Sequence, residues 1–272
     1  MLADFHVHSP ASPDCIEPAA QTLRAAIERG VSILCFTDHL DLICEDTPGK
    51  KNENAIATWE NSYSIVAQAR EEFGTQIEIL HGMELAELTQ DPERARICAA
   101  IPGVDFILGS VHALPGKLDF YLSQEEFADP AVCRKVAAAY VEEVIRTAEL
   151  DLADAMAHLG FYNRYMARHG TYVDLLDFED QMRHLFKVLA RNGKGIEINT
   201  SGLRQALGVT LPDLSLLKLF RECGGEIVTT GSDAHHAHHA GLDLDRAKAL
   251  LQEAGFGYMT IFRQRKPEFI KL

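Results

Sequence analysis

The chain alternates short apolar runs with longer segments in which apolar residues recur every three or four positions. The short runs have the length of β-strands and cover residues 2–7, 31–37, 76–82, 104–110, 152–157, 195–199, 226–231 and 257–262. The longer segments have the period of amphipathic helices and cover 18–29, 56–73, 92–100, 131–148, 180–192, 213–223 and 243–254. Strand–helix alternation without hairpin signals predicts a parallel sheet, and seven or eight such units predict closure into an α/β barrel.

Start signals support three of the helices. Asp91 and Asp129 each precede a proline, and Asp213 follows one, which is typical of helix N-termini. Three strand-to-helix connections are long, at residues 40–55, 113–128 and 159–179. Loops of that length in a compact domain usually have a function, so we expect them to form lids over the barrel mouth.

Length and composition indicate one domain, residues 1–272, because an α/β barrel takes about 250 residues. No apolar run approaches the roughly 20 residues of a membrane span, and the N-terminus lacks the pattern of a signal peptide. Six cysteines without CxxC spacing are typical of reduced thiols in a cytoplasmic protein.

The chain is acidic, with 26 Lys and Arg against 40 Asp and Glu and a formal net charge of −14. Such a surface repels phosphate backbones, so nucleic acid is a disfavoured partner and a small substrate is expected. The sequence carries no signal for an oligomeric state.

Two histidines stand on the first strand, two residues apart. The side chains of His6 and His8 therefore point to the same face, where two imidazoles can converge on one ion at about 2.0–2.1 Å. Asp4 shares this period, and we expect it to hydrogen-bond a ligand histidine from behind.

Further candidate ligands close the later strands, and they are His39, Glu84, His112, His158, Asp233 and His235. Each histidine alone could be a packed core residue. The repetition at carboxyl ends of strands, where barrel enzymes place their chemistry, instead predicts a polynuclear metal centre. Six histidines lie off this pattern: His81, His169, His184, His236, His238 and His239. Of these, the three that follow His235 are interpreted as solvated loop residues.

With DFHVH, TDH, GMEL, GSVH, AHLGF, EINTSGLR and GSDAH, the chain resembles the polymerase-and-histidinol-phosphatase (PHP) superfamily over nearly its whole length. EINTSGLR and the RKP-containing C-terminus resemble the histidinol-phosphatase branch. The resemblance implies a distorted (β/α)7 TIM-like barrel whose strand ends hold two or three divalent ions of zinc, manganese or iron.

The resemblance also implies which side chains hold each ion. One ion takes His6, His8, Glu84 and Asp233. A second shares Glu84 as a bridge with His112 and His158, and a third takes Asp14, His39 and His235. Asp14 departs from the pattern, since several relatives have histidine there, and a hard carboxylate favours manganese or iron over zinc.

Two arginines match family positions that contact the substrate phosphate, Arg164 in GFYNRY and Arg204 in TSGLR. A surface salt bridge is the alternative for each. Asp38 stands beside His39, and we expect it to orient that ligand or to relay a proton. Asp41, Glu45 and Asp46 on the first long loop either face a cationic substrate group or are solvated loop charges.

The activity implied is hydrolysis of a phosphomonoester, most specifically L-histidinol phosphate in histidine biosynthesis. The expected mechanism is attack on phosphorus by a hydroxide that bridges two metal ions, with Asp233 and His235 among the catalytic ligands. No serine or cysteine nucleophile is required.

Three other functions remain open from the sequence. One is a different phosphoesterase of the same superfamily, such as a nucleotide or bisphosphate phosphatase or an exonuclease. An amidohydrolase would need a lysine on a middle strand, where this chain has His112, and Lys117 follows too late. The third is a catalytically silent metal-binding module.

Overall fold

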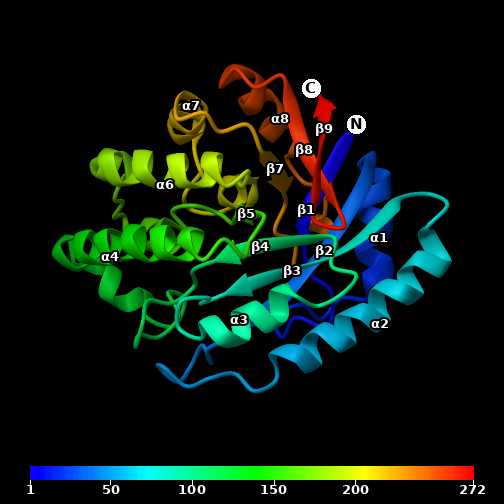
Figure 1. The fold of residues 1–272 in the computed structure, drawn as a ribbon, viewed down its shortest axis with the longest axis horizontal. Coiled ribbons are helices and arrows are strands. Elements are labelled where there is room, and N and C mark those ends of the chain that lie inside the picture. Colours follow the sequence, from blue (N-terminus) through cyan, green and yellow to red (C-terminus); the bar gives the residue numbers. More distant parts are fainter.

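The computed structural model describes all 272 residues. Seven parallel strands form one sheet in chain order, surrounded by helices (Figure 1): β1 (Leu2–Val7), β2 (Val31–Asp41), β3 (Glu78–Ala86), β4 (Phe106–Ser110), β5 (Ala155–Met156), β6 (Gly195–Asn199) and β7 (Val228–Gly231). Past the ends of β1 and β7 the two edges meet, where His8 N donates to Ala234 O at 3.0 Å and Asp233 N donates to His6 O at 2.7 Å. The expected distorted (β/α)7 barrel is confirmed.

The main helices begin and end within one residue of the predicted bounds: α1 (Ala19–Glu28), α2 (Ala55–Phe73), α3 (Pro92–Ala99), α4 (Pro130–Glu149), α6 (Glu179–Arg191), α7 (Leu214–Glu222) and α8 (Leu244–Glu253). The short α5 (Asn163–Met166) lies inside a long loop and was not predicted. The predicted caps form, because the carboxylates of Asp91, Asp129 and Asp213 accept backbone N–H groups of their helices' first turns.

Two strands run further than their apolar stretches. Both β2 and β3 continue four residues past the predicted ends, because their polar carboxyl ends still pair in the ladder. His39 and Glu84 therefore lie within strands and are direct register neighbours. This pairing places an imidazole and a carboxylate side by side at the barrel mouth.

The last predicted strand exists and lies outside the barrel, which leaves seven strands in the parallel sheet. β8 (Tyr258–Arg263) pairs antiparallel with β9 (Lys266–Lys271) in a separate two-stranded sheet. Gln264 and Arg265 form the turn with φ of 50° and 63°, the left-handed region that hairpin turns require. The sequence lacks the Asn-Gly or Asp-Gly pair that usually signals such a turn, so the hairpin was missed.

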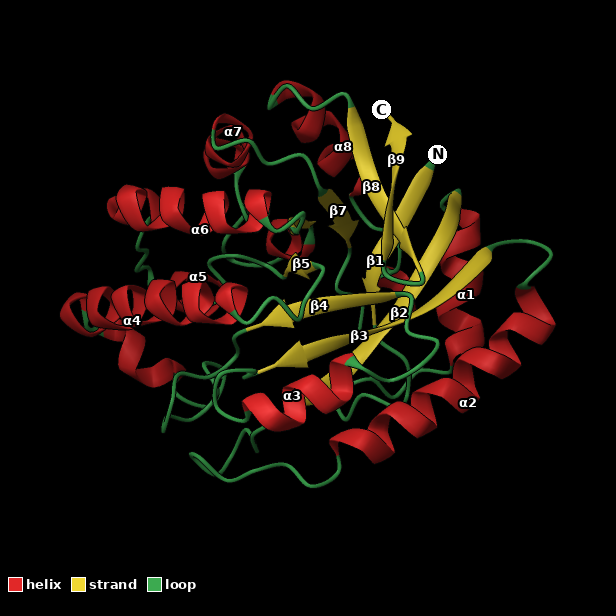
Figure 2. Cartoon of the chain, viewed as in Figure 1, coloured by secondary structure: helices red, strands yellow, loops and turns green.

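This hairpin covers the amino-terminal end of the barrel (Figure 2). Arg265 Nε donates to Asp154 Oδ2 at 2.7 Å and Gln264 N donates to Asp105 Oδ1 at 3.1 Å, just before β5 and β4. Phe262 packs on Phe106 with ring centroids 5.0 Å apart. With that end closed, the carboxyl ends of the strands form the accessible mouth.

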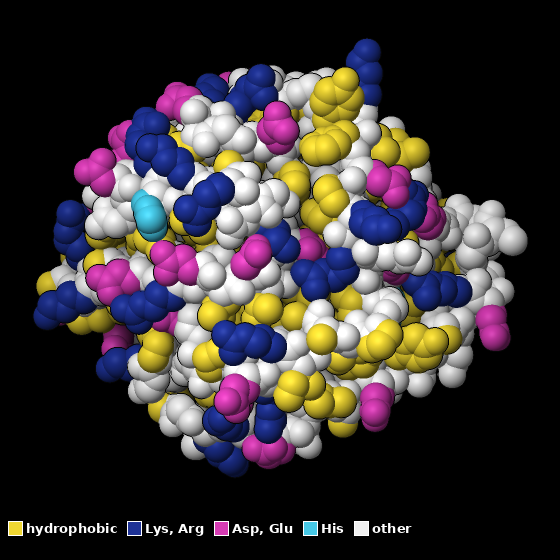
Figure 3. Space-filling model, in the orientation of Figure 1, with side chains coloured by type: hydrophobic (Ala, Val, Ile, Leu, Met, Phe, Trp, Pro, Cys, Tyr) yellow, Lys and Arg dark blue, Asp and Glu magenta, His cyan; other side chains and the backbone are white.

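Acidic and basic side chains are interspersed over the face shown in Figure 3 and do not gather into a basic stripe there. All six cysteines are free thiols. None of the helices combines the length and the apolar character needed to cross a bilayer.

Candidate metal centre

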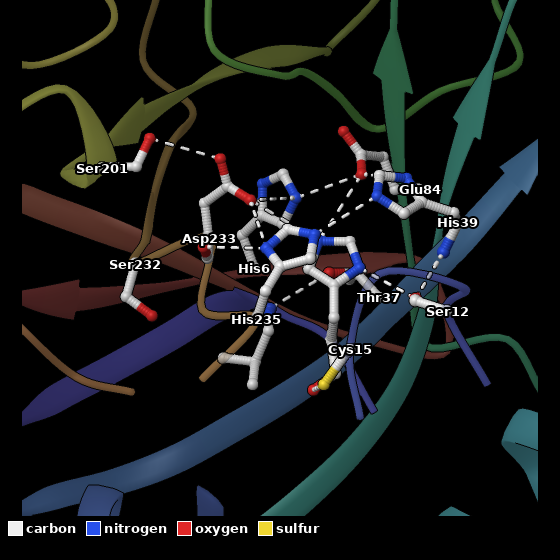
Figure 4. Close-up of polar contacts among 12 residues, drawn as sticks. His6, Ser12, Cys15, Thr37, His39, Glu84, Ser201, Ser232, Asp233 and His235 are labelled. Atoms are coloured by element: carbon white, nitrogen blue, oxygen red, sulfur yellow. Dashed lines mark hydrogen bonds and ion pairs between the residues drawn. The ribbon is translucent and has the colours of Figure 1, made fainter. Parts of the chain in front are cut away.

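Glu84 lies at the centre of the histidines that were predicted as ligands. Its Oε2 is 2.9 Å from His39 Nδ1 and 3.3 Å from His6 Nε2. Its Oε1 is 2.8 Å from His158 Nε2 and 3.1 Å from His112 Nε2. One carboxylate from β3 thus faces imidazoles from β1 and β2 and from the segments that follow β4 and β5, the arrangement a bridging ligand needs (Figure 4 labels Glu84, His6 and His39).

The side chains predicted for the first ion also converge. His8 Nε2 is 3.6 Å from both Glu84 Oε2 and Asp233 Oδ1, and His6 Nε2 is 3.7 Å from Asp233 Oδ1. Asp233 follows β7 in the left-handed region, with φ of 54°. This sharp turn directs its carboxylate back toward β1.

The side chains predicted for the third ion lie next to those of the first, at the carboxyl ends of the strands. His235 Nε2 lies 3.0 Å from Asp14 Oδ2 and 3.3 Å from His39 Nε2, and His39 Nε2 lies 3.7 Å from Asp14 Oδ1. The ring of His235 stacks on that of His8 with centroids 3.9 Å apart. Asp14, His39 and His235 are thus close enough to share an ion.

Unsatisfied polar atoms show that this cluster fits cations. His6 Nε2, His8 Nε2 and Glu84 Oε2 are buried, and none of their close contacts has the geometry of a hydrogen bond. Buried polar atoms are nearly always paired, so atoms of this kind that face one another need a partner. Imidazole nitrogens with carboxylate oxygens are suitable ligands for divalent zinc, manganese or iron.

The carboxylates of the cluster are held in their charged form. Burial by itself would raise the pKa of Glu84, but the imidazoles of His6, His112 and His39 bring it well below its ordinary value. Burial would likewise raise the pKa of Asp233, and Arg164 and His6 outweigh it and lower the pKa. Both groups therefore offer charged oxygens to an ion.

The histidines divide into two kinds. Burial, with the neighbouring His235 and His39, lowers the pKa of His8 to about 3, so this ring is neutral at neutral pH. For His6, burial acts in the same direction, but the carboxylates of Glu197 and Glu84 outweigh it and raise the pKa well above its ordinary value. Without a metal ion, a proton on a ring of the second kind, such as His6, offsets part of the negative charge of the neighbouring carboxylates.

Glu197, on β6, supports the ligands and was missed by the sequence analysis. Its Oε1 is 2.8 Å from His6 Nδ1, and its Oε2 accepts the His158 backbone N–H at 2.9 Å. A charged residue inside the buried strand GIEIN was the available signal.

Asp4 does not have the role expected of it, contact with a ligand imidazole. Its carboxylate accepts N–H groups of Ser232 and Gly241, each at 2.8 Å. The register of β1 against β2 shifts between Asp4 and Val7, which interrupts the strict two-residue alternation on which the expectation relied.

Asp38 lies outside the pocket and does not contact the His39 imidazole. It is fully buried, and Ser9, Ser12 and Ser62 donate to its carboxylate. This placement offers no path for direct proton transfer to a substrate and gives Asp38 a supporting position behind the ligands.

The two predicted phosphate arginines lie in different environments. Arg164 lines the pocket, and its Nη2 donates to Asp233 Oδ2 and to Ser201 Oγ, each at 2.6 Å. Arg204 does not line the pocket, and it donates to the carbonyls of Ser232 at 2.7 Å and Asp233 at 2.8 Å. Arg204 thus braces the turn that carries Asp233.

Of the acidic residues Asp41, Glu45 and Asp46 predicted on the first long loop, Asp41 and Glu45 line the pocket. Asp41 Oδ1 lies 3.4 Å from His112 Nδ1 and so supports a metal ligand. Asp46 accepts the Thr47 hydroxyl at 2.9 Å and lies outside the pocket.

The pocket has a volume of about 380 Å³. All three long loops contribute to its wall, as expected of lids, through Glu45, Asp119, Tyr121, Phe161, Arg164 and Tyr165. The histidines of the following run, His236, His238 and His239, do not line it.

The chain thus forms a seven-stranded barrel, and imidazoles and carboxylates converge at its open end. These two features define the class as barrel proteins with a polynuclear metal site. The sequence model of the PHP domain matches residues 4–201, and the chain belongs to this family. The resemblance noted in the sequence is therefore confirmed.

Within this family, the chain is similar to histidinol-phosphatases in both sequence and structure. The histidinol-phosphatase of Lactococcus lactis is 28% identical over 273 residues, which cover 97% of this chain and 95% of that protein. A crystal structure of histidinol phosphate phosphatase from L. lactis, complexed with zinc, L-histidinol and phosphate, aligns with a TM-score of 0.78 at 26% identity over 98% of both chains. A Listeria monocytogenes structure aligns with a TM-score of 0.76 at 20% identity, over 90% of this chain and 99% of that one, which supports the fold.

Proposed function

We propose that this protein is a metal-dependent phosphatase that hydrolyses L-histidinol phosphate to L-histidinol and phosphate, a step of histidine biosynthesis. The observation that carries the proposal is the convergence of buried imidazoles and carboxylates on Glu84 at the open barrel end. The L. lactis structure with zinc, L-histidinol and phosphate supports the choice of substrate, because it has the same fold over the full chain.

We assign the metal ligands as the sequence predicted them. His6, His8, Glu84 and Asp233 would hold one ion, Glu84 as a bridge with His112 and His158 a second, and Asp14 with His39 and His235 a third. Divalent ions held by these residues would supply positive charge to a phosphate ester and would make water at the site more acidic.

Arg164 is the arginine that we assign to the phosphate. It lines the pocket, and its Nε is buried without a hydrogen-bond partner, so it retains an N–H for a phosphoryl oxygen. Its contact to Asp233 and its packing over Phe161, 4.6 Å from the ring centroid, hold the guanidinium in place.

We infer direct attack by water, because no serine, threonine or cysteine lines the pocket and the histidines in its wall are assigned to metal ions. A bond forms between the water oxygen and phosphorus, the bond from phosphorus to the histidinol oxygen breaks, and the alcohol takes up a proton. A single turnover in oxygen-18 water is expected to label the phosphate. Label in the histidinol would contradict attack at phosphorus.

The cationic end of histidinol phosphate, with its amine and imidazole, needs acidic or aromatic neighbours. Glu45 and Asp119 stand at the pocket wall with Tyr121 and Tyr165, and the two loops are joined by the bond from Asp119 N to Glu45 O at 3.2 Å. We assign these side chains to the cationic end.

A substrate panel tests the proposal. Phosphate release from histidinol phosphate is compared with release from nucleotides, a nucleoside bisphosphate, p-nitrophenyl phosphate and short oligonucleotides, with one metal-loaded sample. Histidinol phosphate is expected to have the highest kcat/KM. A higher value for a nucleotide or oligonucleotide would favour another PHP phosphoesterase, and bound metal without any turnover would favour a silent module.

A further inference from the structure

Asp38 gathers four hydrogen bonds beneath the metal pocket. Ser9 N and Ser12 Oγ donate to its Oδ1, each at 2.7 Å, while Ser9 Oγ at 2.7 Å and Ser62 Oγ at 2.5 Å donate to its Oδ2. All four residues are buried. Because a carboxylate offers only acceptors, each hydroxyl gives its proton to Asp38.

Ser12 has one proton and two lone pairs, and all three are accounted for. The proton goes to Asp38, and one lone pair accepts the His39 backbone N–H at 3.1 Å. The remaining contact is His8 Nδ1 at 3.0 Å. Since Ser12 has no second proton, this contact requires a donor, so His8 carries a proton on Nδ1.

With Nδ1 as the donor to Ser12, Nε2 is the nitrogen that His8 can offer to a metal ion. That atom is buried without a partner and lies 3.6 Å from Glu84 Oε2 and from Asp233 Oδ1. We propose that Asp38 is a positioning residue that, through Ser12, fixes the His8 tautomer in which Nε2 is free for a metal ion. The inference rests on the metal-binding part of the proposed function and is independent of the substrate.

The network extends outward to helix α2. Ser62 gives its proton to Asp38, so His81 Nε2, 2.9 Å from Ser62 Oγ, must be the donor of that contact. The His81 ring stacks on Trp59 with centroids 3.9 Å apart and is buried. Ser62 thus contacts Asp38, and His81 contacts Ser62, on the side away from Ser12 and His8.

Nuclear magnetic resonance of the metal-free wild-type protein tests the tautomer without any substitution. Long-range proton–nitrogen correlations of the imidazole rings distinguish a protonated Nδ1 from a protonated Nε2. His8 is expected to carry its proton on Nδ1. A proton on Nε2 would overturn the inference, whatever the phosphatase activity of the sample.

A matched pair of variants tests the consequence for metal binding. Ser12→Ala removes the acceptor of His8 Nδ1, and zinc affinity, measured by competition with a chelator, is expected to fall about 10–100-fold. Ser62→Ala also removes one donor to Asp38 but leaves the Ser12–His8 contact, so its affinity is expected to stay within about threefold. Circular dichroism checks that both variants fold. Unchanged affinity in Ser12→Ala, or an equal loss in both variants, would contradict the inference.

Discussion

Arg164 and Arg204 both reach Asp233, but with different consequences. Arg164 contacts the carboxylate from inside the pocket, whereas Arg204 holds the backbone carbonyls of Ser232 and Asp233 from outside it. Asp233 has a φ of 54°, a backbone conformation that needs support in a residue with a side chain. We therefore assign substrate binding to Arg164 and the positioning of Asp233 chiefly to Arg204.

Replacement of Arg164 or Arg204 by lysine keeps the positive charge but loses the planar guanidinium with its parallel N–H donors. Arg164→Lys is expected to raise KM for histidinol phosphate about tenfold at unchanged zinc content. Arg204→Lys is expected to lower zinc affinity about tenfold with a smaller effect on KM at saturating zinc. Steady-state kinetics and zinc titration measure both, and the reverse pattern would mean that Arg204 is the phosphate ligand.

Glu45 is expected to select for the cationic end of the substrate. Glu45→Gln removes the attraction between this partly solvated carboxylate and the cationic end of the substrate, so KM for histidinol phosphate is expected to rise about fivefold at low salt. KM for p-nitrophenyl phosphate, which has no cationic group, is expected to stay constant. Asp46→Asn, one residue further and outside the pocket, is the matched control. An equal effect on both substrates would remove Glu45 from substrate recognition.

Apart from Asp14, which lies in the loop after β1 and follows only from the family resemblance, the candidate ligands could be predicted from sequence because each stands at or near the end of a strand whose apolar run is easily recognised. Their supports could not. Glu197 reaches His6 across 191 positions of sequence, and the β1 register shift that diverts Asp4 leaves no mark in the pattern. Contacts of this kind depend on tertiary packing, which periodicity does not encode.

At the level of helices and strands, the helices were predictable to within a residue because amphipathic period and Asp–Pro caps act locally. The C-terminal hairpin was not, since its turn uses Gln264 and Arg265 where glycine or asparagine is usual. The compensation is tertiary: Arg265 donates to Asp154 at 2.7 and 2.9 Å and to Leu152 O at 2.7 Å.

This anchoring predicts an asymmetry between the two hairpin arginines. Arg265→Ala leaves the buried Asp154 without its main partner and is expected to lower the free energy of unfolding by about 2–4 kcal/mol. Arg263→Ala breaks a more exposed pair with Glu78 and is expected to cost less than about 1 kcal/mol. Urea denaturation measures both. Equal losses would mean that the hairpin is not anchored through Asp154.

In the molecule as a whole, a chain of net charge −14 concentrates histidines at one barrel end, where protons and metal ions compete. The carboxylates around His6, His39 and His112 overcome burial and raise the pKa of each ring well above its ordinary value. These rings hold protons at neutral pH in the metal-free protein, and metal ligation requires them to be neutral.

Zinc binding is therefore expected to release protons, and zinc affinity is expected to rise with pH above the ordinary imidazole pKa of about 6.5. The sign follows from the raised pKa values, because each proton that must leave costs less free energy as pH increases. Calorimetry in buffers of different ionisation enthalpy counts the protons released. An affinity that is flat or falls with pH would contradict these pKa shifts.

Zinc-dependent turnover decides whether the cluster around Glu84 is the working site. The wild-type protein is stripped with a chelator and titrated with zinc while phosphate release from histidinol phosphate is followed, beside Glu84→Gln and the exposed control Glu226→Gln. Activity is expected to vanish on stripping, to return as two or three zinc ions bind per chain, and to be at least about 100-fold lower in Glu84→Gln alone. Full activity in the stripped protein, or in Glu84→Gln, would contradict a metal centre organised around that carboxylate.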